Sequence, residues 1–159
     1  MGETMADPED IRNFLRIDAR MTTSGRLQTG DPARLTDIGV RHVINLALDS
    51  HPEALPDAER EMAAAGLRYT HIPIPFDAPT QAHYEALVNA LEGDDEPVHI
   101  HCIMNWRVSA LLYRYRRDVL GVDEALARAD MERIWSPAEM AARGGGPDVS
   151  PWVAIIAVP

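Results

Sequence analysis

Three short segments rich in β-branched residues alternate along this chain with longer segments whose apolar residues recur at helical spacing. The short segments span residues 43–48, 67–74 and 98–101. Runs of this length that are rich in β-branched residues and bounded by glycine or proline predict buried strands. Strands that alternate with helices predict an α/β fold, with a mostly parallel central sheet flanked by helices. At 159 residues the chain is expected to form a single domain.

The remaining elements follow from caps and spacing. Asp31-Pro32 predicts a helix start, and Thr80 is a plausible N-cap for an amphipathic helix. The sequence predicts a first strand over residues 15–23 and helices over residues 7–14, 31–38, 55–65, 80–91, 108–120 and 122–135. We expect the core of the domain at about residues 15–143. A glycine-rich loop over 143–147 leads into an apolar tail over 147–159, which docks either on its own domain or on a neighbour.

Composition limits the classes of function. The net charge of −10 argues against general binding to nucleic acid or to anionic membranes. A single cysteine excludes an internal disulfide framework and a zinc site with several cysteines, and the histidines lack metal-ligand spacing. Residues 1–10 do not resemble a secretory signal, and the longest apolar run, 153–158, is too short to cross a bilayer. We therefore expect a cytoplasmic protein without a metal or cofactor.

The single cysteine, Cys102, lies between the strand at 98–101 and the helix expected from Val108. At a strand-to-helix turn, backbone N–H groups and the helix dipole converge on an anion. That environment favours the thiolate form of a cysteine, which is the nucleophile. Arg107 adds a forked cation suited to phosphate in the same turn. The carboxyl ends of parallel strands are also where ligands bind in open α/β sheets.

The stretch from His101 to Ser109 resembles the active-site loop of cysteine-dependent protein tyrosine and dual-specificity phosphatases. That family has His-Cys, five residues, Arg, and then Ser or Thr. Here Arg107 comes one residue early, with Val108 in the family position, and Asn105 replaces a glycine. The four-residue gap resembles a bacterial phosphatase-like subfamily. One residue on a helix is about 100° of rotation, so Arg107 would aim elsewhere unless the loop is rebuilt. The resemblance covers residues 24–135.

The resemblance implies a role for each residue. Cys102 would be the nucleophile, and Arg107 would clamp the phosphoryl group. Asp77, in the loop after the second buried strand, would be the general acid, with Asp49 as its rival. His101 and Ser109 would support the thiolate. The expected phosphate-binding loop consists of Ile103, Met104, Asn105, Trp106, Arg107 and Val108.

Three functions remain open on these residues. The first is a phosphatase that removes phosphate from phosphotyrosine or a small phosphoester through a cysteinyl-phosphate intermediate. The second is a module that binds phosphate or sulfate without turnover. The third is a rhodanese-like sulfurtransferase, a family whose loop after the cysteine is shorter; His101 and the Asp77 loop favour the phosphatase. Structural alternatives also remain, because a lone cysteine is often a buried hydrophobe and a helical serine often bonds back to a carbonyl.

Overall fold

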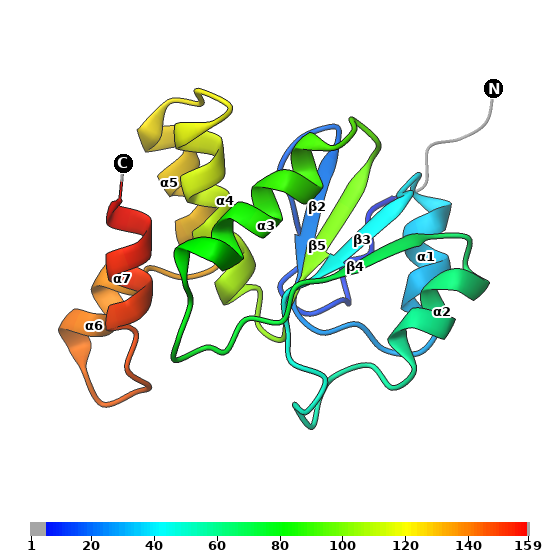
Figure 1. The fold of residues 1–159 in the computed structure, drawn as a ribbon, viewed down its shortest axis with the longest axis horizontal. Helices are drawn as coiled ribbons and strands as arrows, with labels where there is room; N and C mark the ends of the chain where they lie inside the picture. Colours follow the sequence, from blue (N-terminus) through cyan, green and yellow to red (C-terminus); the bar gives the residue numbers. More distant parts are fainter. Residues whose placement is uncertain (1–5, 159) are drawn as a thin grey trace.

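The computed structural model describes residues 6–158 and contains a five-stranded sheet (Figure 1). The strand order is β1-β2-β5-β3-β4. The strands are β1 Leu15–Arg16, β2 Met21–Ser24, β3 His42–Asn45, β4 Arg68–His71 and β5 Val98–His101. β1 is antiparallel to β2, and the other neighbouring pairs are parallel. This arrangement confirms the α/β fold with a mostly parallel sheet, and it makes β5 the central strand.

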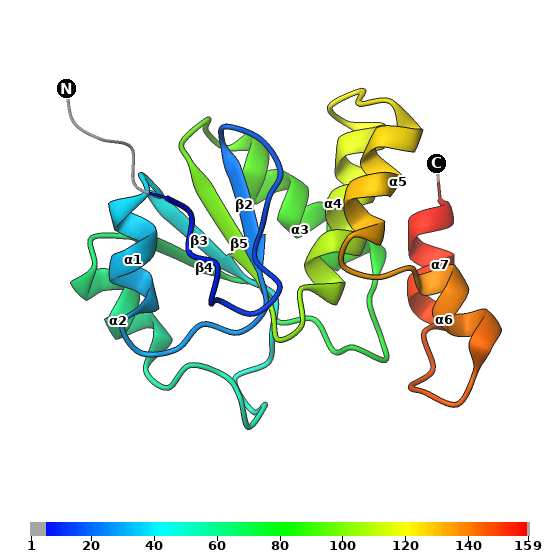
Figure 2. The same cartoon turned by 180° about the vertical axis from the view of Figure 1, so that it is seen from behind.

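Helices cover both faces of the sheet. α1 and α2 lie on one face, α3 and α4 lie on the other, and α5, α6 and α7 lie beyond α4 (Figures 1 and 2). The helices are α1 Asp31–Asp37, α2 Ala58–Ala64, α3 Gln81–Glu92, α4 Trp106–Asp118, α5 Glu124–Glu132, α6 Pro137–Arg143 and α7 Ser150–Ala157. Thr80 is the N-cap of α3, as its position in the sequence predicts. Between residues 6 and 158, no helix is long and apolar enough to cross a membrane.

Side chains that alternate along the strands divide the core into two layers. On β3, Val43 belongs to the cluster formed with α1 and α2, and Ile44 belongs to the larger cluster formed with α3 and α4. Ile44 is in register with Ile100 on β5, and both are fully buried. This period of two is the pattern of a parallel sheet covered on both faces. Cys102 continues the row begun by Ile100 and lies in the larger cluster.

The helix predicted at residues 7–14 is wrong, because this segment forms bends and turns. Its backbone and side chains bind the turn after β2 and the loop after β5 instead. The carbonyl of Arg12 accepts the Gly25 N–H at 2.7 Å. Asn13 takes a left-handed backbone conformation, with φ 50°, which a helix interior would not allow.

The single strand predicted at residues 15–23 is a β1–β2 hairpin. Asp18 Oδ1 accepts the backbone N–H groups of Arg20 and Met21, at 2.9 and 2.7 Å, which reverses the chain between the two strands. An aspartate that binds the N–H two residues ahead is a common turn former. α4 also begins at Trp106, earlier than the Val108 expected from the sequence.

The apolar tail folds back onto its own domain as α7. Trp152 is fully buried, and Ile155 joins the larger core cluster. The indole Nε1 of Trp152 donates a hydrogen bond of 2.7 Å to the carbonyl of Phe76. At the other end of α7, Arg117 of α4 donates to the carbonyl of Ile156 at 2.9 Å. The residues that precede the tail, 137–143, form α6, which the sequence analysis did not anticipate.

Candidate functional site

The candidate site begins at the carboxyl end of β5, in the middle of the sheet. Cys102 follows the last residue of β5, and its side chain is 1% exposed. Its backbone N–H donates to the carbonyl of Ser24 at the end of β2, at 3.4 Å. The loop that follows turns directly into α4 (Figure 1). The thiol therefore lies at the strand-to-helix turn predicted from the sequence.

Asn105 makes this turn tight. Its φ of 66° is left-handed, a conformation that asparagine adopts more readily than most residues. The side-chain Nδ2 donates to the carbonyl of Asn13 and to Thr23 Oγ1, at 2.9 and 3.0 Å. In return, Asn13 Nδ2 donates to the carbonyl of Met104 at 2.9 Å. The N-terminal segment thus helps to fix the loop.

The loop presents a series of backbone N–H groups that have no protein acceptor. Cys102 N–H is bonded to Ser24, and Ser109 N–H is bonded to the carbonyl of Asn105. Within residues 6–158, none of the N–H groups from Ile103 to Val108 donates to a protein oxygen. Buried backbone donors are nearly always satisfied, and successive N–H groups in a turn form a cradle for an anion. The loop has the form of such a cradle around the cysteine.

A second turn, at Gly25 and Arg26, forms one wall of the loop. A Cβ at Gly25 would lie 2.5 Å from the carbonyl oxygen of Ile103, so only glycine fits there. Arg26 N–H donates to that oxygen at 2.9 Å, and Arg12 Nη1 donates to it at 3.3 Å. Glu53 pairs with Arg12 at 2.9 Å and with Arg26 at 3.1 Å. The hydrogen bond from Arg12 lowers the pKa of Glu53, which therefore stays ionised.

Arg107 points toward the ends of two strands. Its side chain is buried, with 7% of the residue exposed. Nη1 donates to the carbonyls of Leu46, just after β3, and Ile74, beyond β4, at 3.3 and 2.8 Å. Among residues 6–158, Nε and Nη2 have no hydrogen-bond acceptor and the guanidinium has no carboxylate within 4 Å. A mostly buried cation without a counter-ion favours an anionic ligand, and Nε and Nη2 are not fully enclosed, so such a ligand can reach them.

His101 and His99 lie under the loop as neutral side chains. Burial lowers the pKa of His101 to about 4, and the charge of His71 adds to this effect. His101 Nδ1 faces the carbonyl of Cys102 at 3.4 Å, and its Nε2 is buried without a partner in the described structure. No role was predicted for His99. Its Nδ1 lies 2.8 Å from Thr22 Oγ1, and its Nε2 lies 2.8 Å from Ser24 Oγ. It joins β5 to β2 beside the cysteine loop.

The contacts of Ser109, Asp77 and Asp49 do not show whether these residues take part in catalysis. Ser109 Oγ donates to the carbonyl of Trp106 at 3.2 Å, the back-bonding that competes with a bond to the thiolate. Asp77 is exposed in the loop between β4 and α3 and has no hydrogen-bond partner among residues 6–158. Asp49 is also exposed and lies 3.8 Å from His71 Nδ1. The roles of Ser109, Asp77 and Asp49 in catalysis remain predictions.

The loop that carries Asp77 is attached to an aromatic cluster of four side chains. The Phe76 ring lies 6.0 Å from Trp106, 6.2 Å from Trp135 and 5.7 Å from Trp152, between ring centroids. The Arg107 guanidinium carbon lies 5.9 Å from the Phe76 ring centre. The residue before Asp77 therefore contacts both the cysteine loop and the candidate clamp. No local pattern predicts this cluster, because its members come from four separate segments.

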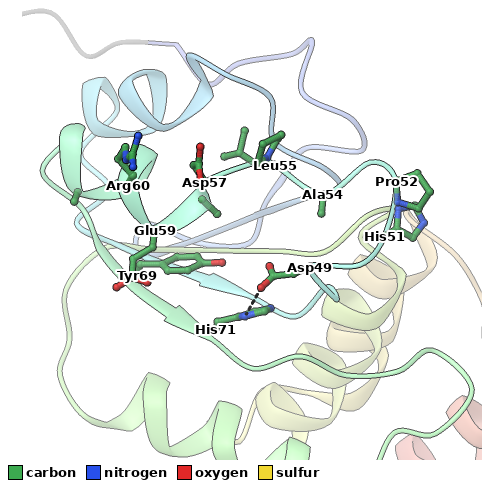
Figure 3. A pocket seen from close by; sticks show the side chains of 13 residues that line it. Asp49, His51, Pro52, Ala54, Leu55, Asp57, Glu59, Arg60, Tyr69 and His71 are labelled. Atoms are coloured by element: carbon green, nitrogen blue, oxygen red, sulfur yellow. Dashed lines mark ion pairs between the residues drawn. The ribbon is translucent and has the colours of Figure 1, made fainter.

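An open hollow of about 1040 Å³ lies at the same edge of the sheet. Figure 3 shows Asp49 and His71 pointing toward each other on one side of it, with the Tyr69 ring beside them. Asp57, Glu59 and Arg60 line the side formed around α2. His71 is in register with Asn45, and Asn45 with His101. Two strand spacings amount to about 10 Å, and no residue of the cysteine loop lines the hollow, so the hollow is separate from that loop.

Together, the fold and the cysteine loop define a phosphatase-like α/β domain related to the tyrosine phosphatases. Residues 13–114 match the family model of the beta-lactamase hydrolase-like protein, phosphatase-like domain. The chain belongs to this family. It is 30% identical over 121 residues to a beta-lactamase hydrolase-like protein of Xylella fastidiosa and 28% identical over 123 residues to that of Agrobacterium fabrum. Each match covers 74% of this chain and 27% of the relative, so the chain spans about a quarter of their length.

Solved structures agree with this assignment. A DUF442 protein from Shewanella putrefaciens CN-32 superposes with a TM-score of 0.79 at 26% identity, covering 96% of this chain and 95% of that one. P. aeruginosa TpbA, solved in complex with pTyr, superposes with a TM-score of 0.68 at 21% identity, covering 98% and 96%. At that identity, the likeness to TpbA concerns the fold alone. The comparisons thus confirm the resemblance to bacterial tyrosine-phosphatase-like proteins.

Proposed function

We propose that this protein is a cysteine-dependent phosphatase acting on an aryl phosphoester such as phosphotyrosine. The observation that carries the proposal is the buried Arg107 guanidinium, which has no carboxylate partner among the described residues. It lies in the helical turn where the N–H groups of Ile103–Val108 also lack acceptors. Both features call for an anion at the mouth of the Cys102 loop. A bound phosphoryl group would supply the missing acceptors.

The proposed reaction has two steps. The Cys102 thiolate attacks phosphorus, an S–P bond forms, and the P–O bond to the leaving group breaks. Asp77 gives its proton to the leaving oxygen. Water then attacks the cysteinyl phosphate while Asp77 takes up a proton, which releases inorganic phosphate and restores the thiolate. The loop N–H groups and the Nε–Nη2 edge of Arg107 stabilise the charge on the equatorial oxygens in both steps.

The fold supports an aryl phosphoester as the substrate. The complex of TpbA with pTyr is a precedent for an aryl phosphate on this fold. We assign Cys102, Arg107 and Asp77 to catalysis, and His101 and Ser109 to support of the loop.

Phosphate release from an aryl phosphate at mildly acidic pH tests the proposal. Wild-type protein should release phosphate, and Cys102→Ser should not, because a serine hydroxyl is a far weaker nucleophile than a thiolate. Mass spectrometry of acid-quenched wild type should find phosphate on Cys102. Turnover by wild type that does not exceed that of Cys102→Ser would refute the proposal.

A second candidate is a phosphate-binding module without turnover. It is favoured by the two carbonyls that already occupy Arg107 Nη1, and by the exposed position of Asp77. Such a protein would be stabilised against heat by phosphate or vanadate and would release no phosphate from esters. A persulfide on Cys102 after treatment with thiosulfate would instead support a sulfurtransferase.

A further inference from the structure

We infer that Trp152 of α7 is a positioning residue for the general acid, holding the Asp77 loop in place through the carbonyl of Phe76. This inference rests on the proposed phosphatase function and deepens it. It assigns a role in the proton-transfer step to a helix that lies outside the segment of residues 13–114 matching the family model.

The Asp77 loop is held at its two ends and at one point between them. At its start, the carbonyl of Ile74 accepts Arg107 Nη1 at 2.8 Å. At its end, Thr80 caps α3 by accepting a backbone N–H, so the chain is fixed again. Between them, the Trp152 indole N–H donates to the Phe76 carbonyl at 2.7 Å. Asp77 follows that carbonyl directly.

Trp152 is well placed to act as a fixed support. The side chain is fully buried, and its ring packs against the Phe76 ring with the centroids 5.7 Å apart. α7 is held at its other end by Arg117 of α4, which donates to the carbonyl of Ile156. The indole N–H is thus presented from a helix whose far end is anchored to α4. The hydrogen bond is only part-buried, so its loss would weaken the hold on the loop by about the 0.5–1.5 kcal/mol of an ordinary hydrogen bond.

The contact also links the acid to the phosphate clamp. The Phe76 ring lies 5.9 Å from the Arg107 guanidinium carbon and 6.0 Å from the Trp106 ring. Trp152 therefore fixes the loop at a residue that already contacts the cysteine loop. Loss of the indole donor would release Asp77 to positions farther from the leaving oxygen. Attack by Cys102 would be little changed, because its own loop keeps all of its contacts.

The test is Trp152→Phe, which keeps an aromatic ring and removes the N–H donor. We compare kcat/KM for phenyl phosphate, whose leaving group needs a proton, with kcat/KM for p-nitrophenyl phosphate, whose leaving group departs without one. This ratio reports formation of the cysteinyl phosphate and not its hydrolysis, in which Asp77 acts on both esters alike. The variant should lose roughly tenfold with phenyl phosphate, the effect of one lost hydrogen bond, and less than about twofold with p-nitrophenyl phosphate. Asp77→Asn should show the same selectivity with a larger loss, about 100-fold or more.

Trp135→Phe is the matched control. Trp135 belongs to the same aromatic cluster, and its indole donates a similar hydrogen bond of 2.9 Å, but to the carbonyl of Trp106 in the cysteine loop. Its loss should slow both esters equally, because it disturbs phosphate binding and not protonation. If Trp152→Phe does not fold, Arg117→Gln loosens the other end of α7 and should show the same selective loss with phenyl phosphate.

The outcomes separate this inference from the function on which it rests. Equal losses on the two esters in Trp152→Phe, or no loss on either, would overturn the positioning role while wild-type turnover upheld the phosphatase. Wild-type turnover no greater than that of Cys102→Ser would overturn the phosphatase and the positioning role together. A selective loss in Trp152→Phe and an equal loss in Trp135→Phe would establish the role.

Discussion

Binding of inorganic phosphate should raise the melting temperature of this protein, and the rise should depend on Arg107. A ligand present at 100 times its Kd adds about 2.7 kcal/mol to the free energy of unfolding. The unfolding entropy of a 159-residue domain is about 0.33 kcal/mol per kelvin. The wild-type melting temperature should therefore rise by about 8 °C under these conditions.

Arg107→Lys should remove most of this rise. Lysine keeps the charge but lacks the fork that gives phosphate two parallel hydrogen bonds. A hydrogen bond to a charged group contributes about 1.5–3 kcal/mol, so one lost bond raises Kd about 100-fold at the upper end of that range. The same phosphate concentration then equals the Kd of the variant and adds only about 0.4 kcal/mol. The expected rise is about 1 °C.

Differential scanning fluorimetry with and without phosphate measures both shifts, and Arg114→Lys is the control. Arg114 lies two turns farther along α4, is 3% exposed, and places its guanidinium carbon 4.0 Å from the Tyr84 ring centre. Arg114→Lys should lower the melting temperature without ligand and keep the full phosphate shift. A full shift in Arg107→Lys would refute the assignment of Arg107 as the clamp.

Three further predictions follow from the site. Gly25→Ala should abolish phosphate release and the phosphate-induced shift, and should cost about 1–3 kcal/mol of stability in urea titrations, because its Cβ would lie 2.5 Å from the Ile103 oxygen; unchanged turnover would contradict this. Because the pKa of His101 falls from 6.5 to about 4 on folding, the unfolded state binds more protons between these values. The free energy of unfolding should therefore decrease by up to about 3 kcal/mol from pH 6.5 to pH 4, and a flat profile from urea titrations would refute this. In pH–rate profiles with phenyl phosphate, Asp77→Asn should remove the limb at higher pH and Asp49→Asn should keep it; the reverse result would identify Asp49 as the acid.

The central elements could be predicted from the sequence because their signals are local. The strands β3 and β5 are buried segments bounded by turns, and Thr80 caps α3 where its residue type predicts. β4 forms where predicted, but the prediction that it is buried is wrong, because it is an edge strand and none of its four residues is buried. The segment before β1 could not be predicted in this way. Asp7-Pro8 has the local signature of a helix start, but the segment instead braces a turn and a loop that follow in the sequence. Tertiary contacts of this kind override local preference.

The candidate site was predictable to the same extent. The position of Cys102 at a strand-to-helix turn can be predicted from the strand, the loop and the helix that adjoin it in the sequence. The left-handed conformation of Asn105 can be predicted from its residue type. The contacts that hold the loop do not follow from either, because Asn13 and Asn105 are 92 residues apart in the sequence. Trp152 lies in a short apolar tail that contains no recognisable motif, so its contact with the Asp77 loop could not be predicted. Its partner is a backbone carbonyl, which has no signature in the sequence at all.

The position of Arg107, one residue early in the loop, can be interpreted only when the spacing and the structure are considered together. The spacing rotates Arg107 by about 100° from the position expected in the resembling family. In the structure this rotation directs Nη1 to the carbonyls of Leu46 and Ile74, which follow two strands beside β5. The guanidinium is thereby fixed before any ligand binds, with its Nε–Nη2 edge lacking an acceptor in the described chain. An arginine held in this way loses little conformational entropy on binding phosphate, so the shifted position is compatible with a preorganised clamp.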